Sequence, residues 1–104
     1  MSKSEFEELA GLIRDFAKTR DWEKFHTPKN LAMALVGEAG ELVAEFQWLT
    51  PEESTKSALG PEQLEAIALE IADVQIYLSR LADVLGIDIP KAVLQKMKIN
   101  ENRF

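Results

Sequence analysis

Apolar side chains follow the segment from residue 61 to residue 85 at spacings that alternate between three and four residues. The seven residues are Leu64, Ile67, Ile71, Val74, Leu78, Leu81 and Leu85. This heptad spacing places all of them on one side of an α-helix. Pro61 suits the first turn of that helix, and Gly86 suits its end, because glycine readily adopts the left-handed conformation that closes helices. The sequence therefore predicts a long helix whose apolar seam can pack against another helix.

Two more helices are predicted before this one. Residues 4–20 carry apolar side chains at helical spacing, and Ser4 with Glu7 forms the pattern of a capping box. A second helix is expected from residue 28 to about residue 48, because Thr27 followed by proline is typical of a helix start.

A loop and a final helix complete the predicted architecture. Residues 49–61 are rich in turn-forming residues, and a short turn is expected after Thr50. Asp88 can cap a last helix over residues 89–100. Three side chains of this helix are expected to face inward, namely Val93, Leu94 and Met97. The predicted fold class is all-α, with a four-helix bundle-like protomer formed by a single domain, residues 1–104.

Composition and charge exclude several classes of function. The chain has 104 residues and no cysteine, which rules out disulfides, thiolate metal sites and a cysteine nucleophile. A net charge of −6 argues against binding a nucleic-acid polymer through its phosphates. No apolar run approaches the roughly 20 residues of a membrane span. We therefore expect a soluble cytoplasmic domain with neither a membrane nor a nucleic-acid polymer as partner.

Four carboxylates stand out because two predicted helices repeat the same acidic spacing. Glu38 and Glu41 lie three residues apart on one helix, as Glu70 and Asp73 do on the other. At about 100° per residue, each pair falls on one side of its helix, and Glu45 falls on the side of the first pair. Glu70 and Asp73 lie within the apolar arc, where an unpaired charge is costly.

Acids of one sign in an apolar arc require a counter-charge. Arg80 is the closest basic residue on that helix, and no lysine or arginine lies on the same face nearby. A hard divalent cation suits such a set, because Mg²⁺ prefers oxygen ligands and shares its remaining positions with water and substrate phosphates. Four carboxylates suit one to three Mg²⁺ ions per site, or Mn²⁺. The alternative interpretation is an exposed charged face at a helix edge.

Other kinds of site are poorly supported. Di-iron helical bundles need histidines three residues after glutamates on facing helices, but the only histidine, His26, precedes the second predicted helix. No zinc ligand set or EF-hand loop is present. The basic stretch over residues 91–104 could hold a phosphorylated small molecule beside a metal site, or could be a solvated helix face.

The acidic pairs and their surroundings resemble a known family. The stretches "GEAGE" and "EIAD" fit the Glu-x-x-Glu and Glu-x-x-Asp signature of all-α MazG-like nucleoside triphosphate pyrophosphohydrolases. Three longer segments are similar to the dCTP pyrophosphatase branch of that family. They are "DWEKFHTPKNLAMALVGEAGELVAEFQW", "LEIADVQIYLSRLADVLGIDIPKAV" and "KMKINENRF".

The resemblance implies a role for particular residues. By position, the magnesium ligands would be Glu38, Glu41, Glu70 and Asp73. The aromatic pocket for the base would comprise Trp22, His26, Trp48 and Tyr77. Other nucleotide contacts would come from Asn30, Lys96, Asn100 and Arg103. Members of the family form oligomers, usually dimers or tetramers, with sites near subunit contacts.

Two functional hypotheses follow. The first is a Mg²⁺-dependent hydrolase that cleaves a nucleoside triphosphate, dCTP or a modified dCTP by resemblance, to the monophosphate and pyrophosphate and so cleanses the nucleotide pool. In this hypothesis Glu41, or its neighbour Glu38, takes the proton of the attacking water. The second is a non-enzymatic helical interaction module that uses the heptad seam, which leaves the acidic residues unexplained.

Overall fold

The computed structural model describes residues 3–104 and consists of four α-helices and one short 3₁₀-helix. The elements in chain order are α1 (Lys3–Thr19), η1 (Glu23–Phe25), α2 (Pro28–Ala44), α3 (Pro61–Leu85) and α4 (Ile89–Arg103). Within the described range there is no strand. The predictions of an all-α class and of four helices are confirmed.

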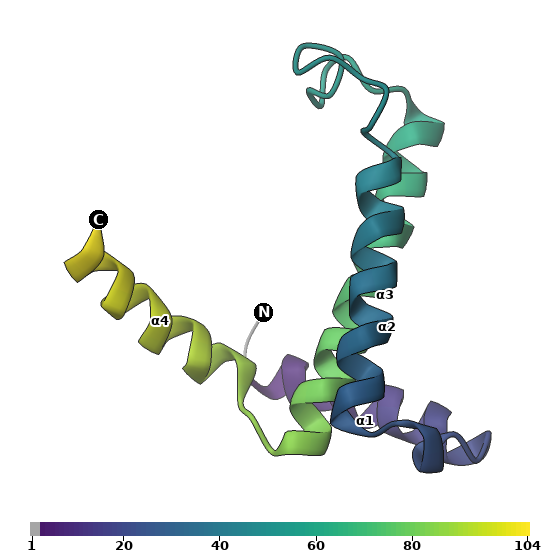
Figure 1. Cartoon of the computed structure of the whole chain (residues 1–104), viewed down its shortest axis with the longest axis vertical. Coiled ribbons are helices and arrows are strands. Elements are labelled where there is room, and N and C mark those ends of the chain that lie inside the picture. The colour runs from purple at the N-terminus through teal and green to yellow at the C-terminus, as the bar shows by residue number, and fades with distance from the viewer. Residues whose placement is uncertain (1–2) are drawn as a thin grey trace.

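The helices α2 and α3 form an antiparallel hairpin, and the other two helices lie around its base (Figure 1). The helix α1 crosses the end of the hairpin where α2 begins and α3 ends. The helix α4 leaves that same end and points away from the hairpin (Figure 1). The loop between α2 and α3 lies at the opposite end of the hairpin, far from α1.

The bounds of α3 agree with the prediction, and its end residues explain them. Gly60 donates its backbone N–H to Oε1 of Gln63 at 3.0 Å, and Pro61 opens the first turn. Gly86 ends the helix in the left-handed conformation with φ of 68°, where a side chain would be strained.

The helix α2 begins where predicted but ends earlier. Oγ1 of Thr27 accepts the backbone N–H of Asn30 at 3.2 Å, which caps the start. The α-helix stops at Ala44 rather than near residue 48, because the next backbone N–H groups donate three residues back instead of four. Thr50 and Glu53 then bond reciprocally, which forms the short turn expected after Thr50.

The two outer helices differ from the prediction at their ends. The helix α1 begins at Lys3, and the side chain of Ser4, which the predicted capping box requires, lies outside the described residues. Oδ1 of Asp88 caps α4 by accepting the backbone N–H of Lys91 at 3.1 Å, as expected. The helix α4 continues to Arg103, three residues beyond the predicted end.

The prediction of a bundle-like protomer is wrong for the isolated chain. Its radius of gyration is 16.1 Å, whereas a compact chain of this length has about 13 Å. The apolar residues buried among residues 3–104 are Ala17, Leu31, Ile67 and Ala82. The side chains of α4 predicted to face inward are instead exposed, Leu94 by 66%, because α4 packs only at its start.

Along residues 3–104, no helix combines the length with the apolar character that crossing a membrane requires.

Candidate metal centre

Four carboxylates from the two hairpin helices converge midway along the hairpin. Glu38 and Glu41 come from α2, and Glu70 and Asp73 come from α3. One oxygen from each can be chosen so that all four lie within 4.8 Å of one another. The cause is local, because residues three apart share a helix face and the antiparallel pairing sets the two acidic faces opposite each other. The predicted cluster of Glu38, Glu41, Glu70 and Asp73 therefore exists in the structure.

In two of these carboxylates, one shielded oxygen has no hydrogen-bond partner among the described residues. Glu38 and Glu70 are half-buried, whereas Glu41 is exposed. Oε2 of Glu38 and Oε2 of Glu70 are shielded from solvent and have no hydrogen-bond partner among the described residues. Shielded polar atoms are almost always hydrogen-bonded in folded proteins. Each of these two oxygens can therefore coordinate a cation or accept a hydrogen bond.

The electrostatics of the cluster disfavour four negative charges. Burial raises the pKa of the Glu38 carboxyl, and the charges of Glu41, Asp73 and Glu70 raise it further. Burial likewise raises the pKa of Glu70, followed by the charges of Glu41, Asp73 and Glu45. Glu45 thus acts on the cluster, although it is not among the four converging residues.

Among the side chains that the structure describes, no lysine or arginine forms a salt bridge with the cluster. The salt bridges formed within the described residues join Arg14 to Asp83, Arg80 to Asp83 and Lys24 to Asp21. Arg80, the closest basic residue suggested by the sequence, is thus paired with Asp83. The cluster offers only oxygen atoms, two of them without hydrogen-bond partners, and no described basic side chain is paired with it. Such a set fits a hard divalent ion.

Four of the predicted nucleotide-binding residues lie on the hairpin helices or in the linker that precedes α2. Trp22 and His26 contact each other edge to face, with ring centroids 6.4 Å apart. Asn30 follows in the first turn of α2, where Nδ2 donates to the backbone oxygen of Phe25 at 3.1 Å. Tyr77 is half-buried on α3, one turn beyond the acidic residue Asp73.

The other predicted nucleotide-binding residues lie elsewhere in a single chain. Trp48 is 87% exposed beyond the end of α2. The helix α2, whose 17 residues span about 25 Å, lies between Trp48 and the linker that carries Trp22. Three further residues, Lys96, Asn100 and Arg103, lie on α4, which points away from the hairpin (Figure 1). One chain therefore does not gather the whole predicted set.

Comparison with known proteins agrees with this geometry. Residues 34–104 match the model of the MazG-like family, and this range contains all four converging carboxylates. The chain belongs to the MazG-like family. Among solved structures, this MazG-like chain is similar to a pyrophosphatase from Archaeoglobus fulgidus, with 41% identity and a TM-score of 0.86. That similarity covers 94% of this chain and 90% of the other.

Curated relatives of this MazG-like chain include dCTP pyrophosphatase 1 from Bos taurus and from Homo sapiens. The bovine protein is 45% identical over 99% of this chain, and the human protein is 47% identical over 94% of it. The chain spans only 61% of the length of the bovine relative and 58% of the human one.

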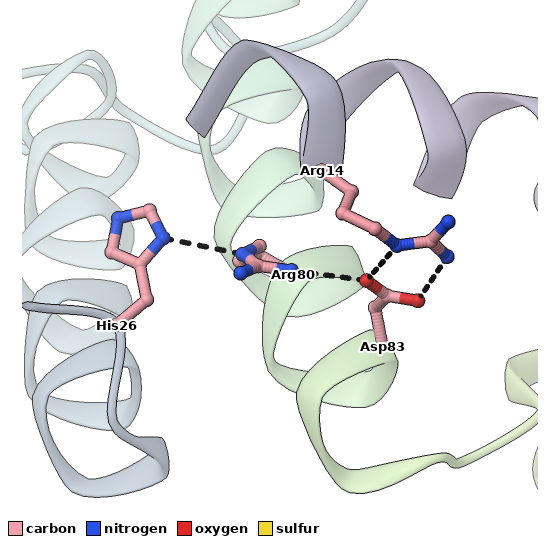
Figure 2. Close-up of polar contacts among 4 residues, drawn as sticks. All are labelled: Arg14, His26, Arg80 and Asp83. Carbon is pink, nitrogen blue, oxygen red and sulfur yellow. Dashed lines mark hydrogen bonds and ion pairs between the residues drawn. The ribbon is translucent and has the colours of Figure 1, made fainter. Parts of the chain in front are cut away.

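Sequence reasoning missed a chain of charged residues beside His26 in this MazG-like fold. Asp83 accepts two hydrogen bonds from Arg14 on α1, at 2.9 and 2.6 Å, and one from Arg80 at 3.0 Å (Figure 2). Arg80 also donates to Nδ1 of His26 at 3.2 Å. The three-residue spacing of Arg80 and Asp83 is visible in the sequence, but the contacts with α1 and His26 depend on tertiary packing.

Proposed function

We propose that this MazG-like chain hydrolyses dCTP and modified dCTP to the nucleoside monophosphate and pyrophosphate in a reaction that requires a divalent metal. The observation that carries the proposal is the convergence of four carboxylates, two of them with a shielded and unpartnered oxygen. Support for dCTP as the substrate comes from the relatives named dCTP pyrophosphatase 1.

The four carboxylates would hold one to three Mg²⁺ ions, or Mn²⁺. When bound, such an ion neutralises triphosphate charge and lowers the pKa of a coordinated water. Glu41 is the exposed acid of the α2 pair, so it is the better placed of the two to accept a proton from the attacking water. Glu38, whose pKa is raised mainly by burial, would serve chiefly as a ligand.

A second copy of the chain would complete the nucleotide-binding site. Trp22, His26 and Tyr77 would contact the base, and Asn30 would hold the linker before α2 in place. In a homodimer or homotetramer, a neighbouring copy would supply Trp48 and the α4 residues Lys96, Asn100 and Arg103. The reason is the separation of these groups within one chain.

Product analysis tests this function. Incubation with dCTP and Mg²⁺ is expected to yield dCMP and pyrophosphate in equal amounts, with no hydrolysis in EDTA. Anion-exchange chromatography resolves the products, and dATP, dGTP and dTTP serve as comparison substrates. Turnover without a divalent ion, or stepwise release of inorganic phosphate, would contradict the proposal.

A further inference from the structure

The contacts of Arg80 determine which nitrogen of His26 carries a proton. The guanidinium of Arg80 has only N–H donors and stays protonated at all accessible pH values. Because Nε of Arg80 points at Nδ1 of His26 over 3.2 Å, Nδ1 must be the acceptor and carries no proton. In a neutral imidazole, the proton then resides on Nε2.

The surroundings of Arg80 leave it little freedom to move away. Only 8% of its side chain is exposed, and Nη1 is held by Asp83. Asp83 is itself held by the two-pronged contact from Arg14, and the Arg14 hydrogen bonds lower the pKa of Asp83 below its ordinary value. Figure 2 shows this chain of contacts running from α1 through α3 to His26.

The second ring nitrogen of His26, Nε2, is available for a further hydrogen bond. Figure 2 shows the second ring nitrogen directed away from Arg80. No described residue is hydrogen-bonded to Nε2, and the ring lies edge to face with the half-exposed Trp22. An N–H donor beside a wide aromatic surface is a combination suited to a stacked nucleobase.

We propose that Arg80 is a positioning residue that holds His26 neutral with its proton on Nε2, so that His26 offers one fixed donor beside Trp22. This donor would bind a ring nitrogen or carbonyl oxygen of the nucleobase, a step that rests on the proposed function. Burial lowers the pKa of His26, and the charge of Arg80 lowers it further, whereas Glu23 on η1 raises it. The net charge of Arg14, Asp83 and Arg80 together is positive, which also opposes protonation.

Histidine NMR of the free protein tests the positioning role without reference to activity. His26 is the only histidine, so ¹⁵N-histidine labelling gives one set of ring signals. The wild type is expected to show an unprotonated Nδ1, a protonated Nε2 and a titration midpoint below 6.5. In Arg80→Met, which keeps the apolar stem, the midpoint is expected to rise by about 1 pH unit and both tautomers to appear.

Two further variants distinguish the positioning of His26 by Arg80 from a general disruption of the contacts among Arg14, Asp83 and Arg80. Arg14→Met removes the hydrogen bonds from Arg14 to Asp83 but leaves the contact between Arg80 and His26. The tautomer of His26 should therefore be retained. Arg80→Lys keeps a charge and a donor and should largely restore the wild-type spectrum. A protonated Nδ1 in the wild type, or equal spectra for wild type and Arg80→Met, would overturn the proposal. If Arg80→Met does not fold, the wild-type spectrum decides: an unprotonated Nδ1 with a protonated Nε2 supports the proposal, and a protonated Nδ1 overturns it.

The nucleobase contact is tested with dCMP as the probe. Adding dCMP to the wild type should shift the Nε2 resonance, and Arg80→Met should bind dCMP about tenfold more weakly, as expected for one lost hydrogen bond. An unmoved Nε2 resonance at saturating dCMP would overturn the contact. Absence of dCTP hydrolysis alongside the expected NMR result would instead contradict the proposed function and leave the positioning of His26 intact.

Discussion

Replacing Glu70 by glutamine is expected to lower the rate of dCTP hydrolysis by about 100-fold or more. The amide keeps the size of the side chain but removes a charge from the four-carboxylate cluster, and it is a much poorer ligand for Mg²⁺. Changes to groups that merely support metal ligands already cost about 10–100-fold in affinity or activity, so loss of a ligand should cost at least as much. Steady-state kinetics at several Mg²⁺ concentrations measure the effect.

The matched control lies on the same helix. Glu65→Gln makes the same chemical change at an exposed position of α3 outside the cluster and should leave the rate within about twofold of wild type. If Glu70→Gln were as active as Glu65→Gln, the four carboxylates would not be the catalytic metal site.

A second prediction concerns the self-association of the protein in solution. We expect the protein to be a homo-oligomer, with a mass in solution of at least twice the 11.7 kDa of one chain. Four of the seven residues of the predicted seam on α3 remain exposed, namely Leu64, Ile71, Leu78 and Leu85. On α2, three apolar side chains form another exposed stripe, namely Met33, Val36 and Val43. Such a large apolar surface is typical of a protein interface.

Light scattering at micromolar concentration measures this mass. Leu94→Asp places a charge on the exposed apolar side of α4 and should lower the mass, because a buried unpaired carboxylate is costly. Gln95→Asp introduces the same group at the next residue and should retain the wild-type mass. A wild-type mass of 11.7 kDa would exclude the oligomer.

Much of the acidic cluster could be predicted because it depends on short-range geometry. Glu38 with Glu41 and Glu70 with Asp73 share a face on any α-helix, and a short chain with two adjacent helices brings such faces together. The bounds of α3 could also be predicted from the sequence, because Pro61 and Gly86 act through local backbone chemistry.

Other features depend on tertiary contacts that periodicity does not contain. The apolar spacing on α4 correctly indicated a helix but could not reveal that Leu94 has nothing to pack against within the chain. The early end of α2 results from a change of hydrogen-bond register after Ala44, where no glycine or proline marks a break. The contact between Arg80 and His26 joins residues 54 apart in the chain, and only the packing of α3 against the linker creates it.

The magnesium dependence of thermal stability tests the metal centre most directly. The pKa values of Glu38 and Glu70 are raised in the fold above their ordinary 4.5. Their charged forms therefore oppose folding at any pH above the raised values, and this cost is relieved as the pH falls toward 4.5. Near pH 7.5, in EDTA, Glu70→Gln should thus melt higher than wild type by on the order of 2–5 °C, while Glu65→Gln should be unchanged.

Magnesium should reverse that order. An ion that binds only the folded protein stabilises it by mass action, so the Tm of wild type and of Glu65→Gln should rise with Mg²⁺ concentration. The Tm of Glu70→Gln should rise much less, because one ligand is missing. Melting curves of the three proteins in EDTA and in Mg²⁺ give the answer. Equal responses of Glu70→Gln and Glu65→Gln to Mg²⁺, or no response of wild type, would contradict a metal site at these carboxylates.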